Sequence, residues 1–101
     1  FVKPTMESFR AAGESADWKN TPGFYMVLTD QAGEKSWPIT GVTYILLQKK
    51  PSDKAKTAEM VKYFKWCFKG GAAMAQKLNY VPVPESVVTL IEAGLKENIS
   101  E

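Results

Sequence analysis

The side chains that could do chemistry are few and far apart in this chain. Cys67 is the only cysteine, Arg10 is the only arginine, and there is no histidine. A serine or cysteine nucleophile needs a base to activate it, and the usual base is therefore missing. The acidic residues are dispersed, and no carboxylate pair stands out among them. We therefore expect no catalytic residues, no metal site and no cofactor, and we predict that the chain is not an enzyme.

Two further features have structural explanations. Cys67 lies inside an apolar helical pattern, which favours a buried structural thiol over a reactive one. A single cysteine also excludes an intrachain disulfide. Gly70-Gly71 lacks the Lys-Ser/Thr ending of a phosphate-binding loop. The glycine pair therefore predicts a break in a helix rather than a ligand site.

Length and charge exclude several classes of protein. A chain of 101 residues forms one small unit, and its 45% hydrophobic and 24% charged residues are typical of a globular protein. The net charge of +2 divides evenly between the two halves, so neither nucleic acid nor an anionic membrane surface is an expected partner. No apolar stretch approaches the roughly 18–20 residues of a membrane span, and no signal peptide is recognisable. Because the chain begins with Phe1, we expect a processed product or a piece of a longer protein.

Residues 36–48 form the stretch around which the chain is organised, because the segments before it and after it differ in their patterns. Trp37 and Pro38 precede Gly41, and the proline removes a backbone donor. Residues 42–47 then form a continuous apolar and β-branched run, which is typical of a strand buried on both faces of a sheet. We predict a bend followed by a central strand; an ordinary core strand after a loop is the plainer alternative.

The elements before this stretch are short. A helix is predicted to start near Thr5 and to stop at Gly13. Residues 24–29 predict a second strand, and residues 30–35 supply turn-forming side chains. Trp18 is either a lid or a plug over the core, and its pattern favours the plug.

The second half is predicted to be helical. Ser52 or Asp53 caps a helix whose apolar face has three- and four-residue spacing: Ala58, Met60, Val61, Phe64, Cys67 and Phe68. Tyr63 and Trp66 widen this face, which is typical of a helix packed on a sheet. A short second piece follows over residues 72–78, and Pro84 fits the first turn of a last helix. The pattern alone predicts an α/β or α+β unit.

Three stretches together carry a family resemblance: FVKPTMESF, FYMVLTDQAGEKSWPITGVTYILLQKK and YFKWCFKGGAAMAQKLNYVPVPESVV. In this order they are similar to the C-terminal part of periplasmic phosphate-binding proteins, the substrate-binding components of phosphate-specific ABC transporters. The resemblance covers essentially the whole chain and includes the distinctive WPIT. Because the family members are much longer, the chain resembles only their last third.

The resemblance implies an α/β fold, as the C-terminal segment of a type II periplasmic-binding-protein fold. Short strands and two to four helices are expected, or α+β for the separate segment. Residues 1–36 would come from the second lobe and residues 42–101 from the first. The connection between the lobes would be the hinge candidates Trp37, Pro38, Ile39, Thr40 and Gly41.

The resemblance also implies a function. Family members hold inorganic phosphate between two lobes and deliver it to an ABC permease from the periplasm or extracytoplasmic surface. Their phosphate ligands lie in the earlier two-thirds of the sequence, and no residue here matches them. This segment is therefore expected to be structural. The alternative is a stand-alone interaction or assembly module. Uncovered apolar strands also predict a homodimer, and a compact monomer is the competing outcome.

Overall fold

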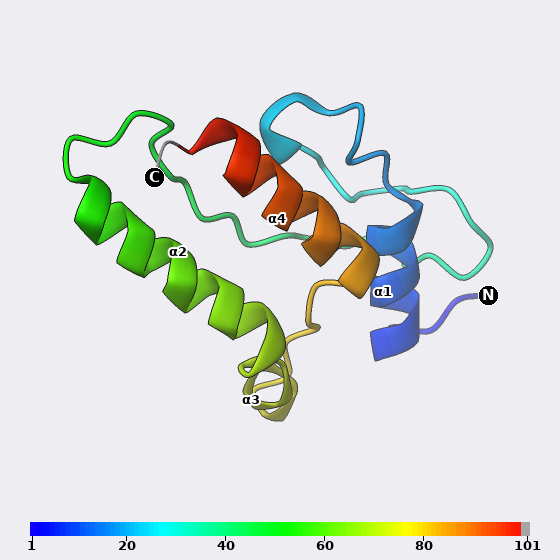
Figure 1. Cartoon of the computed structure of the whole chain (residues 1–101). Coiled ribbons are helices and arrows are strands. Elements are labelled where there is room, and N and C mark those ends of the chain that lie inside the picture. Colours follow the sequence, from blue (N-terminus) through cyan, green and yellow to red (C-terminus); the bar gives the residue numbers. More distant parts are fainter. Residues whose placement is uncertain (100–101) are drawn as a thin grey trace.

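Helices joined by long loops make up residues 1–99, the part of the chain that the computed structural model describes (Figure 1). The elements in order are α1 (Met6–Ser15), the 3-10 turn η1 (Pro22–Phe24), α2 (Lys54–Lys69), α3 (Ala72–Lys77) and α4 (Glu85–Asn98). Helix α1 packs against α4, and α2 leads directly into α3. No helix among these residues is both long and apolar enough to cross a membrane.

Side-chain caps determine where α1 begins. The Thr5 hydroxyl accepts the Ser8 N–H at 3.3 Å, and the Ser8 hydroxyl accepts the Thr5 N–H at 3.0 Å. This reciprocal pair satisfies two amides that a helix start leaves open. The helix does not stop at Gly13, as predicted, but continues to Ser15. Gly13 is buried beside Pro84, and a Cβ there would lie 3.4 Å from the proline ring. This distance is an ordinary van der Waals contact, so Gly13 neither ends the helix nor is required by the space beside Pro84.

The predicted cap and break of the second helix are confirmed. Asp53 caps α2 by accepting the Lys56 N–H at 2.9 Å. The helix ends at Gly70-Gly71, and α3 starts immediately afterwards. A Cβ on Gly71 would lie 2.8 Å from the backbone oxygen of Cys67. The glycine therefore permits a close backbone approach at the corner between α2 and α3.

The core is centred on Trp18 and is small. Trp18 is 8% exposed and packs with Ala16, Leu28 and Val87. Its indole N–H donates to the Gly13 carbonyl at 2.7 Å, and its ring lies 6.4 Å from that of Phe24. Trp18 is thus a plug in the core, as predicted, and it joins the loop after α1 to α4.

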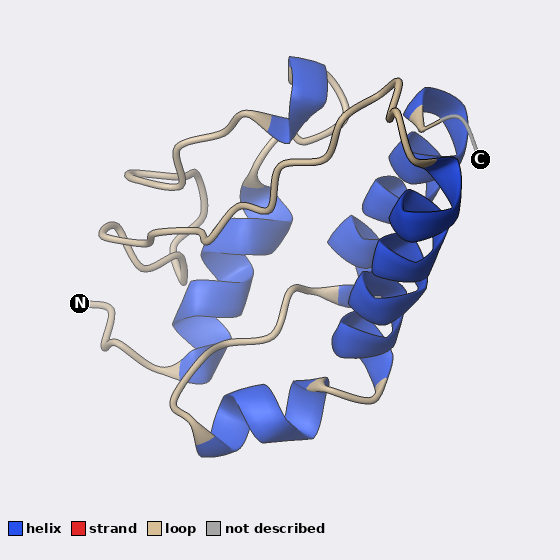
Figure 2. Cartoon of the chain, turned by 90° about the vertical axis from the view of Figure 1, so that its left-hand side faces the viewer, coloured by secondary structure: helices blue, strands red, loops and turns tan. Residues whose placement is uncertain are grey.

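The two predicted strands do not form, so the strand part of the predicted α/β fold is wrong for residues 1–99 (Figure 2). Residues 25–28 and 42–48 are loops. Phe24 and Asp30, at the ends of the first segment, have φ angles of 57° and 56°, which a strand does not adopt. A strand also needs a neighbouring backbone, and among residues 1–99 no backbone hydrogen bond joins these two segments. The bond from the Asp30 N–H to the Pro38 carbonyl, at 2.9 Å, lies outside both of them.

The chain exposes more surface than a compact protein of its size. Its accessible area is 7743 Å², whereas about 5700 Å² is expected for 11.2 kDa. Its radius of gyration is 14.6 Å, against about 13 Å for a compact domain. Leu46, predicted to be buried, is 92% exposed, and Ile45 is also exposed. The apolar run at 42–47 therefore lies on an uncovered surface.

Candidate functional site

Trp37, the first of the predicted hinge candidates at residues 37–41, contacts α1. The Trp37 N–H donates to the Ser8 carbonyl at 3.0 Å. The Trp37 ring lies 6.2 Å from that of Phe9 and is half-buried. One backbone bond and one aromatic contact therefore hold the start of this connection on the first helix.

The rest of the connection is a closed bend. The Thr40 hydroxyl donates to the Trp37 carbonyl at 2.9 Å, and Thr40 is buried. Pro38, Ile39 and Gly41 are exposed, and a Cβ on Gly41 would meet nothing within 4 Å. The structure thus brings Trp37 and Thr40 together but places Ile39 and Gly41 at the surface.

Tyr44 is a contact that the sequence analysis missed. Its hydroxyl accepts the Met26 N–H at 3.1 Å and donates to the Met26 carbonyl. One side chain thereby links the segment before the bend to the segment after it. The sequence did contain a signal for this contact, because a tyrosine in an apolar run carries a hydroxyl that needs a hydrogen-bond partner.

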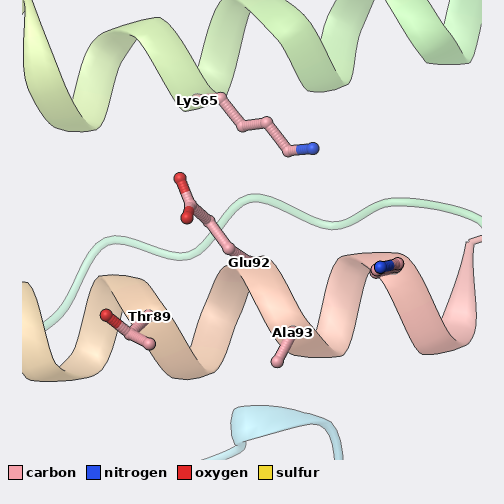
Figure 3. Close-up of a pocket in the computed structure, with 5 residues that line it drawn as sticks. Lys65, Thr89, Glu92 and Ala93 are labelled. Atoms are coloured by element: carbon pink, nitrogen blue, oxygen red, sulfur yellow. The ribbon is translucent and has the colours of Figure 1, made fainter.

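A surface depression of about 530 Å³ lies between α2 and α4. It is lined by Lys65, Thr89, Glu92, Ala93 and Lys96 (Figure 3). Glu92 points from α4 toward α2 in this view. Glu92 pairs with Lys69 at 3.6 Å, and the Thr89 hydroxyl donates to the Glu85 carbonyl at 3.0 Å. The Thr89 hydroxyl is thus engaged within its own helix, whereas Glu92 forms an ion pair between α4 and α2.

Cys67 is half-buried rather than fully buried, contrary to the prediction. Its side chain lies beside Tyr63, and a hydrogen bond between them raises the pKa of the Tyr63 hydroxyl above its usual value. Among residues 1–99, no group of three or more acidic or cysteine side chains is placed to hold a metal ion.

Comparison with known proteins gives a consistent result. The chain is 44% identical over 93 residues to the phosphate-binding protein PstS of Xylella fastidiosa strain Temecula1, covering 92% of this chain and 26% of that protein. It is 40% identical to PstS of Haemophilus influenzae, covering all of this chain and 30% of the relative. PstS of Pasteurella multocida is 39% identical, with 98% and 29% covered. No family model matches the chain.

These relatives are binding proteins, not enzymes, in agreement with the predicted class. The chain is homologous to a segment of the phosphate-binding protein PstS, and the predicted resemblance is confirmed. It spans less than one third of the length of these relatives.

Proposed function

We propose that this chain is the C-terminal segment of an extracytoplasmic phosphate-binding protein. The complete protein would capture inorganic phosphate and deliver it to an ABC permease. One observation carries the proposal: the chain matches its relatives over 92–100% of its own length but over only 26–30% of theirs. The segment itself is structural, and the phosphate ligands lie elsewhere in the complete protein.

The uncovered surface supports this reading. The chain exposes 7743 Å², about 2000 Å² more than a compact protein of this mass. Val27 is 64% exposed and Leu46 is 92% exposed, and among residues 1–99 no backbone hydrogen bond joins their segments into a sheet. In the complete protein these segments are strands of a type II periplasmic-binding-protein fold, paired with sequence that this chain does not contain.

The proposed division into lobes follows the connection at residues 37–41. Residues 1–36 come from the second lobe and residues 42–101 from the first. Across this connection Tyr44 contacts Met26, and Trp18 and Val87 share one core. The lobes would therefore meet there, and closure around phosphate would bend the chain between Trp37 and Gly41.

A chimera tests the proposed function. The matching segment of the Haemophilus influenzae relative is replaced by this chain, which it matches over all 101 residues. Calorimetric titration should show a phosphate affinity within about tenfold of the unmodified relative, because the ligand residues are left in place. A chimera that folds, by circular dichroism, but gives no saturable heat with phosphate would contradict the proposal.

The hinge is tested in the same chimera by Pro38→Gly. Glycine removes the backbone restraint of the proline, and that restraint contributes about 0.4–1 kcal/mol. Phosphate affinity should therefore fall about two- to fivefold, although Pro38 is not proposed to contact the ion. Pro22→Gly, in η1, is the matched control and should leave the affinity unchanged. Unchanged affinity for Pro38→Gly, with unchanged small-angle scattering on phosphate addition, would count against a hinge.

The separate chain is expected to form a homodimer through the 42–46 segment. Leaving several large apolar side chains in water costs about 1.5–3 kcal/mol each, and a second copy would cover them. Sedimentation equilibrium should give about twice 11.2 kDa, and Leu46→Lys should return the monomer. Leu78→Lys, at another exposed leucine, is the control. A single 11.2 kDa species at high micromolar concentration rules the dimer out.

A further inference from the structure

The segment that leads into the connection is a closed loop. Residues 30–38 begin and end at one place, because the N–H of the first residue donates to the carbonyl of the last at 2.9 Å. A surface loop of this length whose ends meet is an Ω-loop. Ser36 closes its interior twice: its hydroxyl donates to the Ala32 carbonyl at 2.7 Å, and its N–H donates to the Gly33 carbonyl at 3.1 Å. The loop therefore has hydrogen bonds of its own that fix its shape.

The closed loop is also attached to α1 at several points. The Trp37 N–H donates to the Ser8 carbonyl at 3.0 Å, and the Trp37 ring lies 6.2 Å from that of Phe9. The Ser36 and Ser15 hydroxyl oxygens are 3.5 Å apart. These contacts extend from the first turn of α1 to its last residue. The loop cannot turn on the helix without breaking them.

Buried polar side chains are concentrated at this attachment. Among residues 1–99 the buried polar residues are Ser8 at 5% exposure, Ser36 at 7% and Thr40 at 8%. The Thr40 hydroxyl donates to the Trp37 carbonyl at 2.9 Å, so it extends the bonded region past the end of the loop. A hydroxyl is costly to bury unless it is hydrogen-bonded, and no buried side-chain oxygen or nitrogen among these residues lacks a partner. The buried hydroxyls are thus used to fix the first part of the connection.

We propose that residues 30–40 move with α1 as one rigid body when phosphate binds, and that Ser36 and Thr40 are the positioning residues that hold this body together. Flexing at Trp37 would break its bond to Ser8 and its ring contact in every binding cycle. The chain instead bends after Thr40, beginning at Gly41, whose backbone is the most permissive. This inference rests on the proposed function and narrows the bend to the part of the connection that follows Thr40.

Thr40→Val in the chimera with the Haemophilus influenzae relative tests the positioning role. Valine keeps the shape but removes the donor to Trp37, so phosphate affinity should fall about two- to tenfold, the range expected for one net hydrogen bond. Thr40→Ser restores the donor and should recover most of the affinity. Thr89→Val is the matched control, because it removes a hydroxyl that donates to the Glu85 carbonyl at 3.0 Å within α4. A Thr40→Val chimera that unfolds at lower urea but binds phosphate with unchanged affinity overturns the positioning role.

Amide hydrogen exchange tests the rigid body itself. The amides of Asp30, Ser36 and Trp37 donate to backbone carbonyls, and in the chimera their protection should be the same with and without phosphate. A change of protection at these amides on phosphate addition overturns the proposal. In the separate chain they should exchange about tenfold or more slowly than the amides of residues 32–35, and equal rates would also overturn it. A chimera that does not bind phosphate contradicts the proposed function instead, and the separate chain then still shows whether the loop is rigid.

Discussion

Replacing Trp18 by alanine should lower the free energy of unfolding by about 3–5 kcal/mol, the largest loss expected for any single substitution in this core. Trp18 is the largest side chain of the small core. It lies in the loop after α1 and packs with Val87 of α4. Truncating a buried aromatic residue costs about 3–5 kcal/mol, and the lost indole N–H also leaves the buried Gly13 carbonyl without its partner. A whole domain has a stability of about 5–15 kcal/mol. Urea titration followed by circular dichroism measures the loss.

Trp66→Ala is the matched control for this prediction. It removes the same side chain from a half-exposed position on α2, so the expected loss of unfolding free energy is below about 1 kcal/mol. Trp18→Phe, which keeps an aromatic ring but removes the donor to Gly13, should fall between the two. If Trp18→Ala and Trp66→Ala unfold at the same urea concentration, the core is not centred on Trp18.

The separate chain should not bind phosphate with useful affinity. Arg10, the only guanidinium group, is exposed and has no basic partner within α1. Two hydroxyls near the bend already donate to backbone carbonyls, Ser36 to Ala32 at 2.7 Å and Thr40 to Trp37 at 2.9 Å. The start of α2 is capped by the carboxylate of Asp53, which repels an anion. An anion would therefore have to displace bonds that hold the fold.

The helices could be predicted from the sequence because their signals are local. Thr5 and Asp53 cap the helices that follow them, and Gly70-Gly71 ends α2 where the pattern indicates. The same reasoning wrongly predicted a strand at residues 42–47, which are a loop in the structure. An apolar run states only that a segment prefers burial, whereas a strand also requires a second backbone that this chain does not provide.

The candidate site was predicted less completely. The sequence placed a bend at Trp37 and Pro38, and the structure has a bend there, closed by Thr40. The contact of Tyr44 with Met26 depends on a loop path that spacing cannot predict. The exposure of Tyr63 and Trp66 was also missed, because an aromatic residue on a helix gives the same pattern whether its covering layer is present or absent.

Paired calorimetric titration with inorganic phosphate tests the central claim most directly. The separate chain and the chimera with the Haemophilus influenzae relative are titrated under the same conditions at modest ionic strength. If this chain is the structural segment of a phosphate-binding protein, the separate chain gives no saturable heat and the chimera binds with an affinity close to that of the relative. A micromolar or tighter dissociation constant for the separate chain, or a folded chimera that does not bind, would contradict the account.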